Sequence, residues 1–142
     1  MRLVGLDLGT KTLGVSITDK TRTLVRPLEV IKFSFEEYYE ALEKIIKLLN
    51  EYNINEVVLG LPKNMDGSLG FAAERSMKFK KILEEKGIIV NLEDERLTTK
   101  SAENIIHDNN MNIKNTKHKI DSIASSIILE SYLKRIKNDI RK

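Results

Sequence analysis

Three acidic residues that are far apart in the sequence stand at positions suited to chemistry. Asp7 and Glu95 each follow a short apolar segment, and Asp121 interrupts an otherwise apolar or small-residue run over residues 120–129. Carboxylates that are crowded together repel one another, and burying each one costs desolvation energy, but a divalent cation reverses both penalties. Hard Mg²⁺ prefers a few carboxylate oxygens and keeps its other positions for water and phosphate. These residue types therefore predict a metal site suited to hydrolysing a phosphodiester, which two ions about 4 Å apart can promote.

Three further residues are candidates for substrate binding near the same carboxylates. Lys11 follows Asp7 in a glycine-containing turn, Asn64 lies in a polar loop, and Arg96 directly follows Glu95. An arginine fork can hold a phosphate through two hydrogen bonds. We therefore expect these side chains to hold the phosphates or the sugar of a substrate.

Each candidate also has an ordinary structural explanation. Asp7 could serve only to begin a turn, because Asp favours such positions. Glu95 could pair with a neighbouring cation, and Asp121 would be favourable near the start of a helix on electrostatic grounds alone. Lys11 and Asn64 could be solvated turn residues. Each signal is weak by itself, and the functional interpretation depends on their convergence.

The elements that would position these residues follow an α/β pattern. Segments rich in Val, Ile, Leu and Thr predict three consecutive strands over residues 2–8, 13–18 and 23–32, joined by short turns. Almost wholly apolar runs predict two more strands, buried on both faces, over residues 56–61 and 88–92. Helical patterns extend from residue 34 to about 53, from 71 to 86, from 99 to 108 and from 116 to 137, the last with a core stripe of Ile120, Ile123, Ala124, Ile127 and Ile128.

The first helix carries a recognisable start signal. Ser34 followed three positions later by Glu37 predicts a capping box, and Phe33 with Tyr38 predicts the accompanying hydrophobic staple. Asn53 is the expected stop of this helix. For the second helix, a glycine at position 87 predicts a left-handed cap.

The order β-β-β-α-β-α-β-α-α predicts a five-stranded mixed sheet with helices on both faces. The two crossover connections require the first, fourth and fifth strands to run parallel. In such open sheets, ligands lie beyond the carboxyl ends of the parallel strands, which is where Asp7 and Glu95 are expected. A shift of one residue at the end of the fifth strand would exchange Asp94 for Glu95, so the sequence leaves that choice open although it favours Glu95.

Length and composition indicate one ordinary globular domain over residues 1–142. Hydrophobic residues make up 41% of the chain and charged residues 32%, there is no cysteine, and no apolar stretch approaches the roughly 20 residues of a membrane span. We therefore expect a soluble, cytoplasmic protein. The net charge of +3 is too small to indicate a nucleic-acid partner by itself, although residues 113–142 hold eight Lys or Arg against three Asp or Glu.

Four motifs in order give the chain a specific resemblance to the YqgF family. They are GLDLGTKTLGV (residues 5–15), GLPKNMDGS (60–68), DERLTT (94–99) and DSIAS (121–125), so the resemblance covers nearly the whole chain. The opening Asp-x-Gly-Thr alone is weak, because sugar-kinase and actin-like ATPases share it. The chain departs from the family at Ser16 and Ser125, where alanine is usual, and both changes are small enough to leave the site plausible.

The resemblance implies an RNase H-like fold and a metal-dependent nuclease with Asp7, Glu95 and Asp121 as its acidic site and Mg²⁺ or Mn²⁺ as its cofactor. The family is associated both with maturation of the 5′ end of pre-16S ribosomal RNA and with Holliday junction resolution. We expect precursor ribosomal RNA as the substrate, with branched four-way DNA as the alternative. A non-catalytic RNA-binding assembly factor and an ATP-dependent phosphotransferase are further alternatives, and the expected state is a monomer or a weak homodimer.

Overall fold

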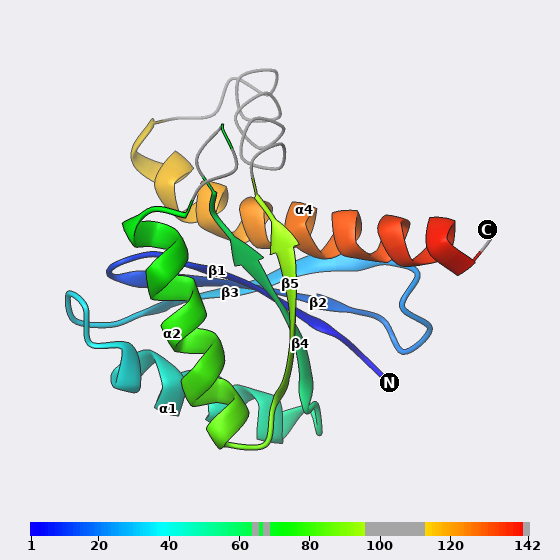
Figure 1. Cartoon of the computed structure of the whole chain (residues 1–142), viewed down its shortest axis with the longest axis horizontal. Coiled ribbons are helices and arrows are strands. Elements are labelled where there is room, and N and C mark those ends of the chain that lie inside the picture. The colour runs from blue at the N-terminus through cyan, green and yellow to red at the C-terminus, as the bar shows by residue number, and fades with distance from the viewer. Residues whose placement is uncertain (64–65, 67–68, 96–112, 141–142) are drawn as a thin grey trace.

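The computed structural model describes residues 1–63, 66, 69–95 and 113–140, and for residues 113–122 and 138–140 it describes the backbone alone. Helices α1 and α2 cover one face of a sheet, and helix α4 covers the other (Figure 1). In chain order the elements are β1 (Val4–Leu8), β2 (Thr12–Thr18), β3 (Val25–Lys32), α1 (Tyr38–Glu51), β4 (Glu56–Leu61), α2 (Phe71–Glu85), β5 (Ile89–Asp94) and α4 (Ile113–Ile140).

The described sheet has five strands in the order β3-β2-β1-β4-β5. Strands β1, β2 and β3 form antiparallel hairpins, whereas β1 pairs with β4, and β4 with β5, in parallel. The predicted mixed sheet and its two crossovers are therefore confirmed. As a result, the carboxyl ends of the parallel strands β1, β4 and β5 lie at the same end of the sheet.

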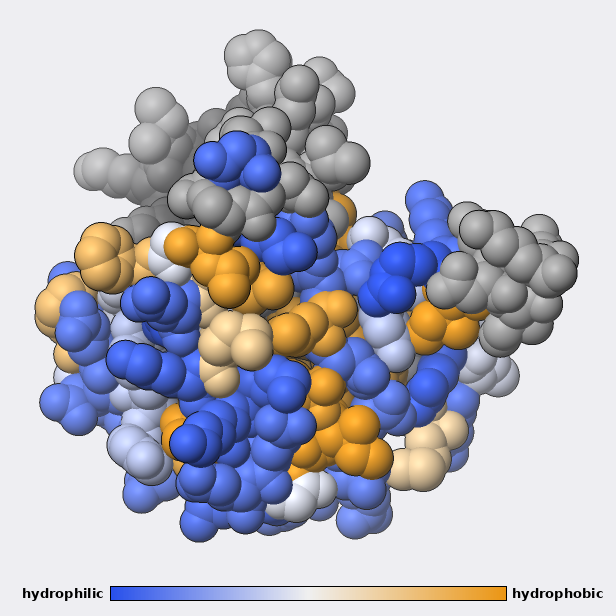
Figure 2. Space-filling model, viewed as in Figure 1, coloured by the Kyte–Doolittle hydropathy of each residue, from blue (hydrophilic) through white to orange (hydrophobic). Residues whose placement is uncertain are grey.

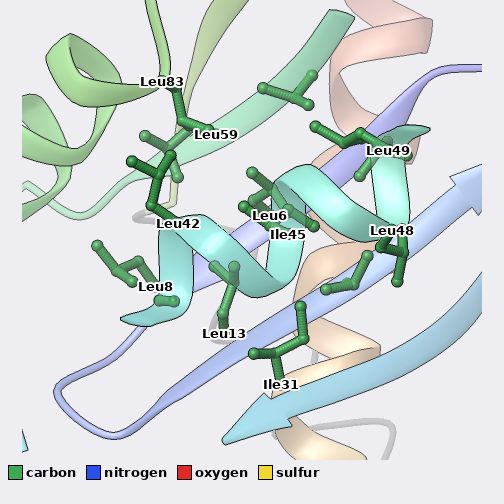
Figure 3. Close-up of a cluster of buried hydrophobic side chains, with 14 of the residues drawn as sticks. Leu6, Leu8, Leu13, Ile31, Leu42, Ile45, Leu48, Leu49, Leu59 and Leu83 are labelled. Carbon is green, nitrogen blue, oxygen red and sulfur yellow. The ribbon is translucent and has the colours of Figure 1, made fainter. Parts of the chain in front are cut away.

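Strand residues alternate between two different environments. Val4, Leu6 and Leu8 of β1 face α1 and α2, because successive side chains of a strand point to opposite faces. This side holds the larger core, in which α1 lies across the sheet (Figure 3). The residues labelled in Figure 3 show its composition: Leu6, Leu8, Leu13, Ile31, Leu42, Ile45, Leu48, Leu49, Leu59 and Leu83.

The face covered by α4 has a smaller apolar cluster, formed by Leu3, Val58, Ile128, Leu129 and Leu133. The predicted stripe of this helix is confirmed for two members, since Ala124 and Ile128 are buried, while Ile123 and Ile127 are half-buried. The side chain of its fifth member, Ile120, lies outside the described part of the chain. The buried stripe extends further along the helix than predicted, because α4 spans the whole sheet from β3 to β5.

The predicted capping box at the start of α1 is wrong. The helix begins at Tyr38, and the preceding Glu37 makes no side-chain cap hydrogen bond. The backbone N–H of Ser34 instead donates to the Glu40 carboxylate at 3.2 Å. The rings of Phe33 and Tyr38 do meet, with centroids 5.9 Å apart, as the staple predicted.

Tertiary contacts explain why the helix starts late. The backbone N–H of Phe33 donates to the carbonyl of Lys11, and that of Glu36 donates to the carbonyl of Thr10, both at 2.9 Å. These bonds tie the segment before α1 to the β1–β2 turn, and Glu36 adopts a left-handed φ of 58°. Local capping preference is therefore overridden by the turn that follows Asp7.

The other element boundaries agree closely with expectation, with one difference that matters for the site. Asn53 stops α1 at a φ of 55°, and Gly87 follows α2 at a φ of 83°. Strand β5, expected over residues 88–92, extends to Asp94. The helix expected over residues 99–108 lies outside the described residues.

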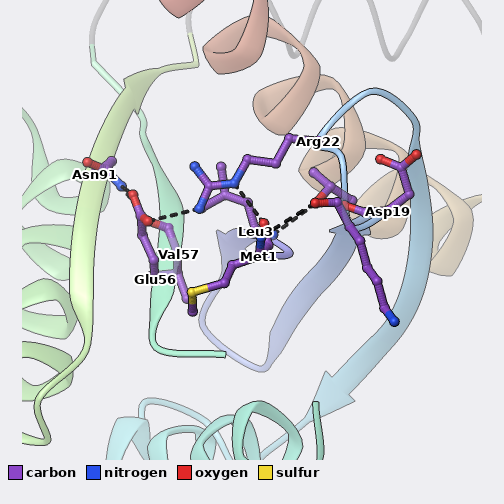
Figure 4. A network of polar contacts seen from close by, with 9 residues as sticks. Met1, Leu3, Asp19, Arg22, Glu56, Val57 and Asn91 are labelled. Carbon is purple, nitrogen blue, oxygen red and sulfur yellow. Dashed lines mark hydrogen bonds and ion pairs between the residues drawn. The ribbon is translucent and has the colours of Figure 1, made fainter. Parts of the chain in front are cut away.

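The amino ends of β1, β4 and β5 are joined by a polar network (Figure 4). Arg22 donates through Nε to the carbonyl of Met1 at 2.8 Å and through Nη2 to the Glu56 carboxylate at 3.1 Å. Asn91 donates to the other oxygen of Glu56 at 3.0 Å. This network closes the end of the sheet opposite the carboxyl ends of the parallel strands.

The face of the molecule seen in Figure 2 is largely hydrophilic, with hydrophobic residues in patches between the charged ones. Within the described residues, no helix is both long enough and apolar enough to cross a membrane.

Candidate active site

Asp7 lies near the carboxyl end of β1, on the face of the sheet that α4 covers. It is half-buried and pairs with Gly14 of β2 in the antiparallel ladder. Gly5, two residues earlier, shares this face and lies directly beneath α4. The strand therefore directs this carboxylate towards α4 and away from the large leucine core.

Glu95 reaches the same face from β5. Its backbone N–H donates to the carbonyl of Leu61 at 3.2 Å, which continues the parallel ladder one step beyond the end of the strand. The Glu95 side chain is only 6% exposed, and it forms a hydrogen bond with Asp7. Asp94, one residue earlier, belongs to the opposite face by the alternation of the strand. The extra length of β5 thus places Glu95, and not Asp94, on the same face as Asp7.

Gly60 makes room for the Glu95 side chain. A Cβ atom at Gly60 would lie 2.6 Å from Cδ and Oε1 of Glu95, and 2.6 Å from Cδ1 of Ile128. No real Cβ tolerates such contacts, so the carboxylate occupies the space that a side chain on β4 would fill. This role was not assigned from the sequence, although a glycine inside a buried strand signals the close approach of another group.

Beside Asp7, the buried Glu95 carboxyl favours its protonated form when no cation is bound. Burial raises the pKa of Glu95, and its hydrogen bond to Asp7, the charge of Asp7 and the charge of Asp94 raise it further, to about 10. The protonated Glu95 carboxyl then donates to the Asp7 carboxylate. A cation can take the place of this proton, because its charge offsets both the burial and the neighbouring negative charge that raise the pKa of Glu95.

The structure describes some of the other predicted site residues and not the rest. Lys11 is exposed at the tip of the β1–β2 turn, three residues beyond the end of β1. The backbone of Asp121 lies in α4, but its side chain is outside the described residues, as are Asn64 and Arg96 altogether. In the part of the chain that the structure describes, no cluster of three His, Cys, Asp or Glu side chains is found.

Helix α4 approaches the sheet very closely beside Asp7. A Cβ atom at Gly5 would lie 2.5 Å from Oγ of Ser16 and 2.8 Å from the backbone oxygen of Ser125. The Ser16 hydroxyl donates a 2.9 Å hydrogen bond to that same oxygen. The Ser16 side chain therefore makes a contact that an alanine could not make, whereas Ser125 contributes only its backbone to it, and the sequence alone did not indicate this contact.

Solved structures with a similar arrangement of elements identify the fold. The chain is similar to Thermus thermophilus RuvC in complex with a Holliday junction substrate, with a TM-score of 0.61 and 17% identity over 96% of both chains. It is also similar to the fowlpox virus Holliday junction resolvase, with a TM-score of 0.54 and 19% identity over 96% of this chain and 99% of the other. At these identities the likeness establishes the RNase H-like fold alone. In this fold the chain places a buried carboxylate, Glu95, beside Asp7 at the carboxyl ends of its parallel strands.

The sequence comparison makes the assignment specific. The chain belongs to the RuvX family, described as Holliday junction resolvase, which matches residues 1–135. Proteins from Geobacillus sp. (strain WCH70) and Bacillus subtilis (strain 168) are each 41% identical over 134 residues, or 94% of this chain and 97% of theirs. Both bear the name "Putative pre-16S rRNA nuclease". The chain is thus a member of a family of hydrolases that act on phosphodiester bonds.

Proposed function

We propose that this chain is a divalent-metal-dependent nuclease that cleaves structured RNA in the cytoplasm, at the 5′ end of precursor 16S ribosomal RNA. The proposal also assigns Asp7, Glu95 and Asp121 as the carboxylates that hold Mg²⁺ or Mn²⁺. The observation that carries it is the contact between Asp7 and Glu95, which come from strands far apart in the sequence and meet at the carboxyl edge of the parallel strands. The names of the curated relatives supply the choice of RNA.

The backbone alignment of α4 supports Asp121 as the third member. The Ser125 carbonyl and the Leu129 Cβ both lie over Gly5, and Leu129 and Leu133 also pack with Leu3, which precedes Gly5 on β1. From Gly5 to Asp7 the strand advances about 6.6 Å. From Ser125 back to Asp121 the helix advances about 6 Å. These similar advances support the proposal that Asp121 belongs to the same site as Asp7.

The side chains present fit a hard divalent cation. Asp7 and Glu95 offer only oxygen donors, which a hard divalent cation prefers, and its charge would offset the burial of Glu95 and the charge of Asp7 beside it. Such a cation, when bound, supplies an activated water and neutralises the leaving oxygen of an in-line displacement. Lys11, exposed at the neighbouring turn, would hold a phosphate of the RNA strand, and we assign Asn64 and Arg96 to substrate contacts as well.

The test is a cleavage assay on precursor ribosomal RNA, with Mg²⁺ or Mn²⁺, that compares the wild-type chain with Asp7→Asn. The matched control is Glu85→Gln, which also neutralises one acid but lies exposed in the last turn of α2, away from the site. Wild type and control should cleave, and Asp7→Asn should not. Retained metal-dependent cleavage by Asp7→Asn would overturn the assignment of the site.

The family description favours one second candidate, resolution of four-way DNA junctions. A resolvase must present two sites to one junction and therefore acts as a dimer. The same assay decides between the two if a synthetic four-way junction is included and the oligomeric state is measured by light scattering. Paired symmetrical incisions by a dimer would replace the RNA proposal, whereas tight RNA binding without metal-dependent cleavage would indicate an assembly factor.

A further inference from the structure

A second buried carboxylate, Glu93, lies two residues before Glu95 on the same face of β5. It is 6% exposed and is held by two residues of α4 that are one helical turn apart. Arg135 donates to Oε1 through Nε at 2.9 Å and through Nη2 at 2.7 Å, and the Ser131 hydroxyl donates to Oε2 at 2.7 Å. We call Glu93, Ser131 and Arg135 the α4–β5 clamp.

The clamp supplies directional contacts between α4 and the sheet, which the apolar part of this interface lacks. Contacts among Leu3, Ile128 and Leu129 are non-directional, so they hold α4 against the sheet without fixing its position along its own axis. Charge-assisted hydrogen bonds are short and directional, and they fix that position. The aromatic ring of Tyr132 adds to this restraint, since the Arg135 guanidinium lies 5.3 Å from its centroid.

The clamp holds strand β5, which has a hydrogen-bonded neighbour on one side only among the described strands. Strand β5 is at the edge of this described sheet and pairs with β4. A further directional contact between α4 and the sheet, from Ser16 to Ser125, lies on β2. Anchors on two different strands restrain both the sliding and the rotation of α4 over the sheet.

The two anchored elements carry two of the proposed metal ligands. Glu95 follows Glu93 by two residues on β5, and Asp121 precedes Ser131 by ten residues, or about 15 Å along α4. A small change of angle at the clamp is therefore amplified at Asp121. Octahedral Mg²⁺ demands near-ideal ligand geometry, so this displacement would matter for binding the cation.

We infer that Glu93 is a positioning residue, which acts through Arg135 and Ser131 to set the register of α4 against β5, and hence the spacing between Asp121 and Glu95. This inference rests on the proposed function, because it concerns the same carboxylate site. Glu93 itself contacts neither substrate nor cation in this account.

A distance measurement tests the register directly. The chain has no cysteine, so a spin-label pair can be introduced through Lys81→Cys on α2 and Lys137→Cys on α4, both exposed. Pulsed electron resonance should give a shifted or broader distance distribution for Glu93→Gln than for the labelled parent. The matched control is Glu40→Gln, which loses a carboxylate bound by Lys44 on α1 and should leave the distribution unchanged.

Kinetics separate positioning from simple loss of stability. Glu93→Gln and Arg135→Gln should each lower kcat by roughly 10- to 100-fold, the effect of a misplacement of about 1 Å. Each should also weaken Mn²⁺ binding measured by calorimetry, with KM for the nucleic acid nearly unchanged. The double variant should be no worse than either single one, because both remove the same contact. Arg135→Lys, which keeps a cation beside Glu93, should recover part of kcat.

The outcomes distinguish this inference from the proposed function. If the wild type binds Mn²⁺ and cleaves, but Glu93→Gln matches it in kcat and Mn²⁺ affinity, the positioning role is overturned and the proposed function stands. A lower melting temperature with unchanged kcat, or a changed distance with unchanged kcat and affinity, overturns the positioning role in the same way. A wild-type chain that neither binds Mn²⁺ nor cleaves overturns both.

Discussion

The Ser16 hydroxyl on β2 donates a 2.9 Å hydrogen bond to the backbone carbonyl of Ser125 on α4. This bond crosses directly above Gly5, where the absence of a side chain allows helix and sheet to approach. Because Asp7 is two residues further along β1, the contact sets how far α4 stands above the proposed active site. This polar bond between α4 and β2 thus links the packing of α4 to the chemistry of the strand ends.

Replacing Ser16 by alanine should weaken this attachment without breaking the fold. We expect Ser16→Ala to lower the free energy of unfolding by about 1 kcal/mol, the usual net value of one hydrogen bond. The Ser125 carbonyl, which loses this donor, stays in its place inside helix α4, so the rest of the interface should be unchanged. Chemical denaturation with urea measures the change, and a loss greater than about 3 kcal/mol would mean that Ser16 does more than make this bond.

Replacing Gly60 by alanine should be far more damaging, because the new methyl group would overlap Glu95 and Ile128 at 2.6 Å. We expect Gly60→Ala to cost about 1–3 kcal/mol of stability, typical of overpacking, and to displace the Glu95 carboxylate. Thermal denaturation and Mn²⁺ titration together test this.

Gly9→Ala is the control for that experiment. A Cβ atom at Gly9 would come no closer than 3.3 Å, to the backbone oxygen of Thr12. The loss of stability should therefore be smaller than for Gly60→Ala. Equal losses for the two variants would show that the space over Gly60 is not the decisive factor.

The stability of the metal-free protein should fall as the pH rises above about 4.5. Burial and the contact with Asp7 raise the pKa of Glu95 from 4.5 to about 10 in the folded state. Below pH 4.5 both the folded and the unfolded chain hold this proton, so the raised pKa carries no penalty. Between the two values the unfolded chain releases the proton while the folded chain keeps it, so the folded state loses stability with each step in pH.

Melting temperatures in the presence of a chelator, from pH 5 to pH 9, measure this trend against Glu95→Gln. That variant removes the titrating group and should show a flatter profile over the same range. Parallel profiles for the two proteins would contradict the raised pKa of Glu95.

Asp7→Asn should lower nuclease activity without lowering the stability of the metal-free protein. The substitution removes the charge that Glu95 faces, so the pKa of Glu95 should fall and the metal-free variant should be at least as stable as the wild type at pH 8. Nuclease activity should fall by more than about 100-fold, beyond the range seen when a supporting contact at a metal site is lost. Calorimetry and the cleavage assay on the same preparation test both parts, and a variant that unfolds at a lower temperature than wild type would contradict the first.

Much of the fold follows from local pattern, and so was predictable. Continuous apolar runs gave β4 its exact limits, and Gly87 and Asn53 ended their helices because both residues tolerate a left-handed backbone. The start of α1 was not predictable in this way. Backbone bonds to the β1–β2 turn, made by residues distant in sequence, outweigh the local capping preference of Ser34.

The candidate site, like the fold, could be predicted from the sequence only in part. Residue types and motif order singled out Asp7 and Glu95 as candidate acids, because several individually weak signals converged on the ends of predicted parallel strands. Only the tertiary structure decided that Glu95 and not Asp94 meets Asp7, since that choice depends on where β5 ends and on the space above Gly60. It also decided that Glu93 is bound by Arg135, because a hydrogen bond across 42 residues depends on how a helix packs on a sheet, and no local pattern encodes that packing.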